Sequence, residues 1–248
     1  AAGRENMELY LDLHSQPCRS VYLLAKRTGI PFTFKSVDLS AGQQFGEDFG
    51  KVSVVRKVPA MKDGDFILTE SVAILQYMVE KFPQLVPGHW YPSDLQRRAL
   101  VNEFLSWQHT ALRAHGSKVF WFRVGLPPLP RVAVPKEKMD SALEDLKQTM
   151  DLFQSKFLKD SSFIAGEEVS LADLVAIVEI MQPVGTGLDV FEGQPALSAW
   201  RERVKKVIGE ELFDEAHQSI MNVDCLAKTF QDNGMLEFLK PRINKMFT

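Results

Sequence analysis

A short segment of the chain, Ser15-Gln16-Pro17-Cys18-Arg19, could stabilise a thiolate. It follows the apolar pattern Glu8–Leu13, which predicts a strand, and Pro17 is typical of the first turn of a helix. Redox proteins with this layout carry C-x-x-C, but Ser15 stands in the place of the first cysteine, so dithiol chemistry is excluded. Because free N–H groups at a helix N-terminus attract negative charge, a hydroxyl there indicates a site for the thiolate of another molecule.

The local residues leave other interpretations of this turn open. Ser15 also fits an ordinary helix N-cap without chemistry. Cys18 is expected to be a small buried side chain rather than a reactive thiol. Tyr10 lies inside the predicted strand and is expected to pack there. Arg19 either contributes to the electrostatics of the turn or forms an ion pair on the helix surface.

Composition limits the class of protein. The chain has 248 residues, 45% of them apolar and 25% charged, which is ordinary for a globular protein with one large or two small domains. A net charge of −3 does not indicate a nucleic-acid or anionic-membrane partner. Two cysteines suit a reducing compartment, and no apolar run approaches the ~18 residues of a membrane span. We therefore expect a cytoplasmic protein without a signal peptide.

The pattern of elements changes near Lys81. Before it, strands and helices alternate in the order β-α-β-α-β-β-α, with the second helix around Glu47–Val52 and a hairpin signal at Asp63-Gly64. A proline-rich linker follows, and after it the patterns are helical only. A long helix is predicted from Leu95 to about Arg123, then a loop over Leu126–Pro135.

Two later helices are predicted in this second part. Apolar residues at helical spacing mark one from Met139 to Phe157. Leu171–Gln182 is apolar almost all round, which predicts a buried central helix. Ser170 and Asp173 have the spacing of a capping box at its start, a role in folding.

These motifs together resemble the cytosolic glutathione transferases, most closely the theta class. The segments that carry the resemblance are Leu11–Arg19, Lys57–Gly64, Leu68–Ile74, Glu103–Thr110 and Ser170–Ala176. The resemblance implies an α/β thioredoxin-like N-terminal domain followed by an all-α C-terminal domain. The two together make up the glutathione transferase fold. We expect the first domain at residues 7–82, a linker at 83–94, and a helical domain with the electrophile site and a C-terminal lid at 95–248.

The resemblance also implies an activity. Ser15 would donate a hydrogen bond to the sulfur of glutathione, whose thiolate attacks small electrophiles such as alkyl halides and sulfate esters, with hydroperoxide reduction as a further reaction. Glutathione would be a co-substrate, and no tightly bound cofactor is expected. The five histidines have no ligand spacing, so we predict no metal site.

The family pattern assigns residues that would bind glutathione. The backbone of Val58, before an expected cis Pro59, would pair with the cysteinyl part. Glu70 and Ser71 would take the γ-glutamyl ammonium and carboxylate, although a helix-capping pair is the local alternative. Gln44 and Lys57 are candidates for the glycyl carboxylate.

Further candidate site residues lie in the predicted helical domain. Thr110 and Arg113 would face the cleft from the long helix, with plain packing as the alternative. Arg242 lies in the C-terminal segment that would cover the site, where an arginine can hold a sulfate or a leaving halide; an exposed tail charge is the alternative. The apolar face of this lid would comprise Met235, Leu236, Phe238, Leu239, Ile243 and Met246.

The sequence also predicts an assembly and leaves two alternatives to the transferase function. We expect a homodimer in which the N-terminal domain of one subunit contacts the helical domain of the other, because Phe104, Trp107 and Trp121 offer more apolar surface than one core uses. The alternative to an enzyme is a non-catalytic scaffold with the same fold. A third hypothesis is thiol transfer through Cys18. It is disfavoured because Ser15 stands where such enzymes carry the attacking cysteine.

Overall fold

The computed structural model describes residues 6–124 and 134–245. Its N-terminal part is built on a four-stranded sheet in the order β2-β1-β3-β4. The strands are β1 (Met7–Leu11), β2 (Phe32–Ser36), β3 (Ala60–Asp63) and β4 (Phe66–Thr69). β2 runs parallel to β1, and β3 runs antiparallel to both β1 and β4, with Met61 opposite Leu9 and Leu68.

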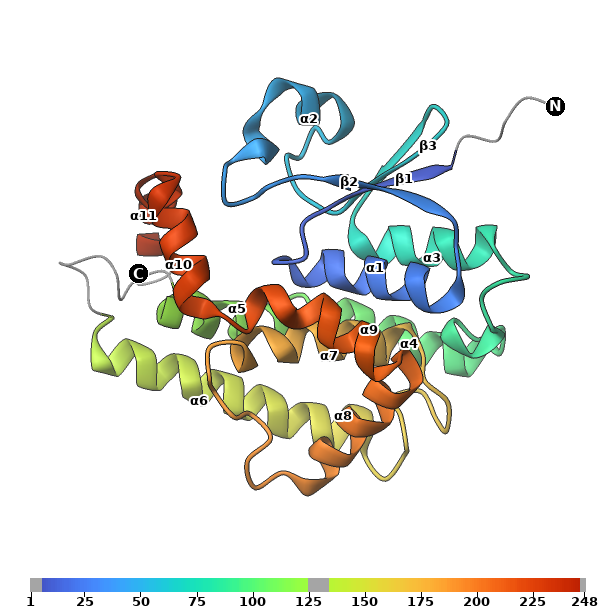
Figure 1. Cartoon of the computed structure of the whole chain (residues 1–248). Helices are drawn as coiled ribbons and strands as arrows, with labels where there is room; N and C mark the ends of the chain where they lie inside the picture. Colours follow the sequence, from blue (N-terminus) through green and yellow to red (C-terminus); the bar gives the residue numbers. More distant parts are fainter. Residues whose placement is uncertain (1–5, 125–133, 246–248) are drawn as a thin grey trace.

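Helices cover both faces of this sheet (Figure 1). α1 (Gln16–Thr28) and α3 (Ser71–Lys81) lie on the face toward the helical part. The 3₁₀ turn η1 (Gln43–Phe45) and α2 (Glu47–Val52) lie on the other side, where Phe49 packs on Val37 and Ala60. The expected order β-α-β-α-β-β-α is confirmed, including the second helix over Glu47–Val52.

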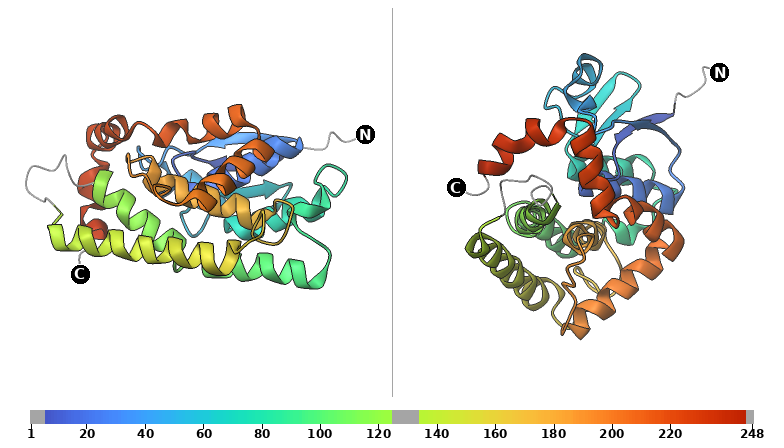
Figure 2. Two further views of the ribbon diagram at one scale, coloured as in Figure 1. Left: turned by 90° about the horizontal axis from the view of Figure 1, so that it is seen from below. Right: turned by 60° about the vertical axis from the view of Figure 1, so that its left-hand side comes forward.

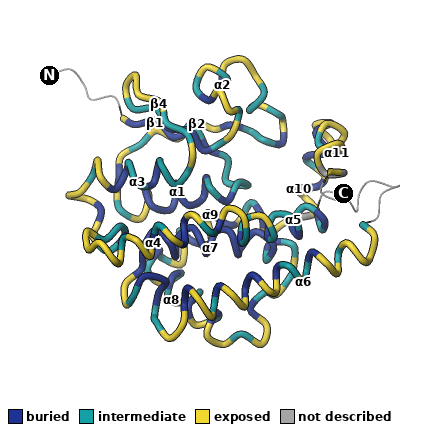
Figure 3. The backbone as a smooth tube through the Cα atoms, turned by 180° about the vertical axis from the view of Figure 1, so that it is seen from behind, coloured by how far each residue is buried: buried dark blue, intermediate teal, exposed yellow. Residues whose placement is uncertain are grey.

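In the second part, the regular elements of the described residues are all helices, apart from an isolated β-bridge between Phe163 and Gly166. Its elements are η2 (Gly88–Trp90), α4 (Leu95–Trp107), α5 (Leu112–Val124), α6 (Lys136–Leu152), the π turn η3 (Phe153–Leu158), α7 (Leu171–Val184), α8 (Pro195–Ile208), α9 (Glu210–His217), η4 (Gln218–Ile220), α10 (Val223–Asp232) and α11 (Met235–Lys245). α7 runs through the middle and is buried along nearly its whole length, as expected (Figure 3). The capping box of Ser170 and Asp173 at its start is confirmed.

The single long helix predicted from Leu95 to Arg123 is wrong, because the chain bends between α4 and α5. At the bend the N–H of Arg113 bonds the carbonyl of Gln108, five residues back, at 2.9 Å. This bond spans one residue more than an α-helical turn, so the helix axis changes direction there. The bend brings Gln108 and Arg113 toward the N-terminal part. Of the predicted loop Leu126–Pro135, residues 126–133 lie outside the described residues.

The last two helices leave the bundle and reach the N-terminal part (Figure 2). The side chain of Asn233, between α10 and α11, donates to the carbonyl of Ser40 at 3.1 Å. Met235 and Leu236 are buried in a small cluster with Phe120 and Phe230. The C-terminal segment thus packs against the N-terminal part, and its role as a lid over the site stays a prediction. Of its expected apolar face, Met246 and the side chain of Ile243 lie outside the described residues.

Candidate active site

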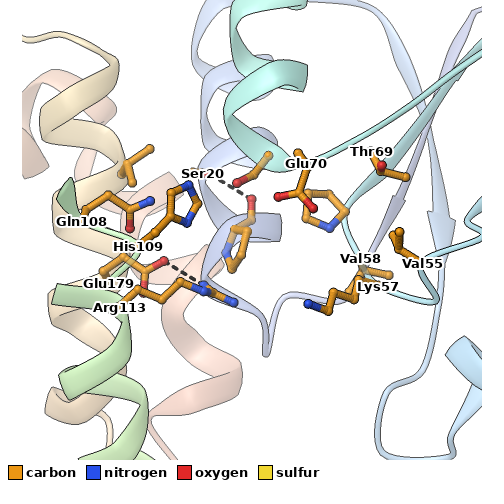
Figure 4. Close-up of a pocket in the computed structure, with 14 residues that line it drawn as sticks. Ser20, Val55, Lys57, Val58, Thr69, Glu70, Gln108, His109, Arg113 and Glu179 are labelled. Carbon is orange, nitrogen blue, oxygen red and sulfur yellow. Dashed lines mark hydrogen bonds and ion pairs between the residues drawn. The ribbon is translucent and has the colours of Figure 1, made fainter. Parts of the chain in front are cut away.

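A pocket of about 150 Å³ opens between the N-terminal part and the helical part (Figure 4). Residues from α1, from the segment before β3 and from the start of α3 line one side, and residues from the α4–α5 bend and α7 line the other. The lining residues are Pro17, Ser20, Val55, Lys57, Val58, Pro59, Thr69, Glu70, Ser71, Gln108, His109, Arg113, Val175 and Glu179. Five of the expected site residues, Lys57, Val58, Glu70, Ser71 and Arg113, therefore meet in one pocket.

Ser15 lies at the N-cap position of α1, next to this pocket but not among its lining residues. Its hydroxyl makes no capping hydrogen bond, although its extended backbone has the geometry of a cap. Its N–H donates to the carbonyl of Asp12 at 3.0 Å, which closes the turn. The hydroxyl is therefore not consumed by the helix end, as the N-cap alternative would require.

The neighbouring residues of the turn are not nucleophiles. Cys18 is fully buried, and burial raises the pKa of its thiol to about 12. The Tyr10 hydroxyl donates to Glu8 at 2.9 Å, and burial together with this bond raises its pKa to about 12. Packing roles for Cys18 and Tyr10 are confirmed. The surface ion pair considered for Arg19 is wrong, since Arg19 is fully buried. Its charge acts on the turn instead, where it lowers the pKa of Cys18 against the effect of burial and its guanidinium bonds the Leu13 carbonyl.

Val58 and Lys57 form the edge of the pocket beside the sheet. The Val58–Pro59 peptide bond is cis, as expected. Among the residues described, the N–H and C=O groups of Val58 have no hydrogen-bond partner. Lys57 is exposed beside them, with its backbone tied to the Ser53 hydroxyl. A peptide lying along this edge would meet one free donor and one free acceptor.

Glu70 and Ser71 stand where β4 passes into α3. Ser71 is the first helical residue, so its side chain lies next to the free N–H groups of the α3 N-terminus. Glu70 has φ of 70°, a left-handed conformation that costs energy for any residue except glycine. Neither side chain makes a capping hydrogen bond. The capping alternative is thus not supported, and the N-terminus of α3 is open to an anion.

The helical side of the pocket carries residues that sequence reasoning missed. Arg113 donates to Oε1 of Glu179 at 2.9 Å, and burial raises the pKa of Glu179 while Arg113 opposes the rise. Among the described residues, Glu179 Oε2 and Gln108 Oε1 are buried acceptors without a donor. Each had a signal in the sequence: Glu179 is an acid inside an almost wholly apolar helix, and Gln108 lies within a quoted family motif.

Besides Ser15, three expected residues lie outside the lining. Gln44 is on η1 and has a buried, unpartnered Oε1. Thr110 is exposed on the α4–α5 bend. Arg242 is exposed on α11, with its guanidinium 5.4 Å from the Phe45 ring and 5.7 Å from the Phe238 ring. Within the part of the chain that the structure describes, no group of three or more His, Cys, Asp or Glu could hold a metal ion.

Comparison with known proteins places this geometry in a family. The model of the glutathione S-transferase N-terminal domain matches residues 6–80, and that of the C-terminal domain matches residues 112–206. The chain is 50% identical to human glutathione S-transferase theta-1 over 215 residues, 87% of this chain and 89% of the relative. It belongs to the theta-class glutathione S-transferases. The bovine theta-1 protein is similar at 51% identity, with the same coverage of each chain.

Solved structures agree with this theta-class assignment. The fold matches human glutathione S-transferase T1-1 in its apo form with a TM-score of 0.88 and 44% identity, over 98% of this chain and all of that one. It also matches a human theta-class enzyme in complex with the glutathione conjugate of 1-menaphthyl sulfate, with a TM-score of 0.85 and 44% identity over 93% of this chain and 98% of that chain. The thioredoxin-like domain followed by an all-helical domain is therefore established.

Proposed function

We propose that this theta-class transferase binds glutathione in the interdomain pocket, stabilises its thiolate with Ser15, and transfers it to small electrophiles. The observation that carries the proposal is the position of Ser15 at the N-terminus of α1, where its hydroxyl makes no capping hydrogen bond. It lies beside a pocket whose lining offers a free backbone edge and an open anion site. These features are complementary to a short peptide with a thiol and carboxylates.

The cysteinyl part of glutathione would lie against Val58, whose unpaired N–H and C=O groups accept an added strand. The glycyl carboxylate would then extend toward Lys57, with Gln44 as a neutral second contact. Lys57 lines the pocket, which supports this orientation.

The γ-glutamyl end would fill the floor of the pocket. Its carboxylate would meet Ser71, the α3 N-terminus and Arg113, with Thr110 at the rim of the bend. Its ammonium has three donors, and Glu70, Gln108 Oε1 and Glu179 Oε2 offer acceptors. The pocket lining contains two basic residues, Lys57 and Arg113, and two acidic residues, Glu70 and Glu179. This combination suits a zwitterionic amino-acid group.

Ser15 would act as a donor and would not ionise. A free thiol has a pKa of about 8.5, and lowering it by ~2 units requires ~2.7 kcal/mol of preferential stabilisation of the anion. A hydrogen bond to a charged group contributes about 1.5–3 kcal/mol, and the helix N-terminus adds about 0.3–1 kcal/mol. Together these contributions give about 1.8–4 kcal/mol, a range that includes the required value.

The thiol proton would leave to solvent, and the thiolate would attack the electrophilic carbon. The sulfur–carbon bond forms as the carbon–halogen or carbon–oxygen bond breaks, and halide or sulfate departs with the bonding electrons. With a hydroperoxide, sulfur attacks the terminal oxygen and releases an alcohol. A second glutathione then reduces the sulfenic acid to give the disulfide and water.

Turnover of glutathione with alkyl halides, arylmethyl sulfates, hydroperoxides and chlorodinitrobenzene tests this function. Ser15→Ala should lower kcat/KM by at least about tenfold, since it removes one hydrogen bond to an anion, while the fold stays intact. Cys18→Ala, the matched variant in the same turn, should keep most activity because its thiol is buried. Unchanged activity of Ser15→Ala would remove Ser15 from the mechanism, and activity lost in Cys18→Ala would favour thiol transfer.

The non-catalytic alternative predicts no turnover of any of the four substrates by the wild-type protein. The pocket argues against it, because a scaffold has no need of unpaired groups around a closed pocket floor. Two free cysteines support a reducing, cytoplasmic location. None of the helices within the described residues is both long and apolar enough to cross a bilayer.

A further inference from the structure

The turn before Ser15 is held by a buried arginine from the helix that follows it. Arg19 Nη1 donates to the carbonyl of Leu13 at 2.7 Å and to that of His14 at 3.2 Å. Its side chain is fully buried, so these bonds are shielded from water. The two carbonyls belong to the two residues directly before Ser15, and Arg19 therefore determines where the chain enters the N-cap position.

The same guanidinium also bonds the central helix of the other domain. Nη2 donates to the carbonyl of Val178 at 3.2 Å and to Oε1 of Gln182, both on α7. Gln182 Nε2 in turn donates to the carbonyl of His14 at 3.2 Å. The turn is thus fixed from two directions, by Arg19 from its own helix and by Gln182 from across the domain interface. We call Arg19 and Gln182 the turn clamp.

The clamp keeps its charge although it is buried. Burial lowers the pKa of Arg19 to about 10, and the negative charge of Glu179 opposes this shift, so the guanidinium stays protonated at neutral pH. A planar, charged fork can bond four acceptors in two directions, which the ammonium of a lysine cannot do with the same geometry.

We propose that Arg19 and Gln182 are positioning residues that fix the Ser15 hydroxyl against the sulfur of bound glutathione. The inference rests on the proposed function of Ser15. A hydrogen bond to an anion requires the donor within about 0.5 Å of its productive place. Nothing else in the described contacts ties the Leu13 and His14 carbonyls to the helical domain.

The hydrogen bonds of the clamp reach the turn at Ser15 and none of the residues that would hold the peptide. The charge of Arg19 also acts on Glu179, and both Arg19→Lys and Gln182→Met preserve that charge. Val58, Glu70 and Ser71, which would hold the peptide, make no hydrogen bond with Arg19 or Gln182. Loosening the clamp should therefore raise the pKa of the bound thiol and lower kcat, while the dissociation constant of glutathione stays nearly constant. A general loss of packing would weaken binding and catalysis together.

The test measures the thiolate absorbance of bound glutathione against pH, with glutathione affinity by calorimetry and kcat at pH 6.5. The variants are Arg19→Lys, which keeps the charge, and Gln182→Met, which keeps the shape and every backbone bond of Arg19. Each should raise the bound-thiol pKa by about one unit and lower kcat about tenfold, the weight of one hydrogen bond to a charged group. Glutathione affinity should change less than about threefold, since the peptide contacts are untouched.

Arg27→Lys is the matched control, because Arg27 also lies on α1 and donates to a backbone carbonyl of the helical domain, that of Val207. It should leave the bound-thiol pKa unchanged. The inference is overturned if Arg27→Lys shifts the pKa equally, or if folded Gln182→Met leaves it unmoved. If Arg19→Lys does not fold, the pKa of the bound thiol in Gln182→Met tests the inference alone. A wild-type protein that binds no glutathione would instead refute the proposed function itself.

Discussion

At the scale of single residues, the pocket floor contains buried hydrogen-bond acceptors that have no donor among the described residues. Gln108 and Glu179 are 2% and 3% exposed, and each keeps one oxygen without a donor among the described residues. Buried polar atoms are nearly always hydrogen-bonded, so a ligand with N–H groups would satisfy both. The γ-glutamyl ammonium of glutathione is the group that the proposed orientation brings there.

This assignment predicts how the enzyme discriminates between thiols. The glutathione analogue that lacks the γ-glutamyl amino group should show lower kcat/KM than glutathione with the wild-type enzyme. Gln108→Met keeps the side-chain length but cannot accept a strong hydrogen bond. It should reduce the ratio of kcat/KM for glutathione to kcat/KM for the analogue about tenfold. Ser106→Ala, a change at an exposed residue of α4, serves as the control. An equal loss with both thiols would show that Gln108 has only a packing role.

At the scale of elements, the lid is joined to the N-terminal part through η1. The Phe45 and Phe238 rings lie 4.9 Å apart, and Arg242 stacks on both. Met235 packs close to Gly42, where φ is 74° and an added Cβ would lie 3.0 Å from the Met235 sulfur. Because Gln44 lies between these contacts on η1, the lid borders the residue proposed to bind the glycyl end.

Arg242 should therefore influence which electrophile reacts. We expect arylmethyl sulfates and small alkyl halides to react faster than bulky aromatic chlorides. Arg242→Trp should narrow the site and depress the sulfate reaction most, by about tenfold or more, because a tryptophan cannot hold a sulfate through paired hydrogen bonds. Arg242→Lys keeps the positive charge and should therefore lose less of the activity toward arylmethyl sulfates. Full activity of Arg242→Trp on all four substrate types would make Arg242 a surface charge only.

At the scale of the whole molecule, the aromatic residues expected to form a dimer interface are used within the chain. Phe104 is buried against Phe153 and Phe157, and Trp107 stacks on Phe157 at 4.6 Å. Trp121 packs against Phe230 of the lid. That reason for a dimer is wrong, although the dimer itself stays a prediction.

A different apolar surface supports the dimer. Phe66 and Ile67 on β4 are 48% and 41% exposed, and Leu95 and Leu100 on α4 are 82% and 46% exposed. α3 connects the two sets, since Tyr77 packs on Phe66 and Gln76 donates to Asn102 of α4. This surface joins an N-terminal strand to a helix of the other domain, as the expected subunit arrangement requires.

Sedimentation at micromolar concentration should show a dimer. Leu100→Glu should shift it toward monomer, because a charge in a buried apolar interface is costly. Leu152→Glu is the control, since Leu152 is similarly exposed but lies on α6. A wild-type protein that sediments only as monomer would refute the prediction.

The sequence by itself determined the order of elements in the N-terminal part, the turn at Ser15, the capping box of α7 and the family. These features depend on residues within a few positions of one another, where periodicity, capping and turn chemistry act. Val58, Glu70 and Ser71 could also be proposed, because each lies in a contiguous motif. The boundaries 7–82 and 95–248 and the roles of the site residues remain predictions.

Only the tertiary structure decided what meets across the domain interface. Arg19 and Val178 are 159 positions apart, and no local pattern shows that a charged residue of α1 is buried there. The bend between α4 and α5, the unpaired acceptors of Gln108 and Glu179, and the contact of Arg242 with Phe45 have the same origin. Each depends on long-range packing that outweighs the local preference of the segment for a surface helix or a free side chain.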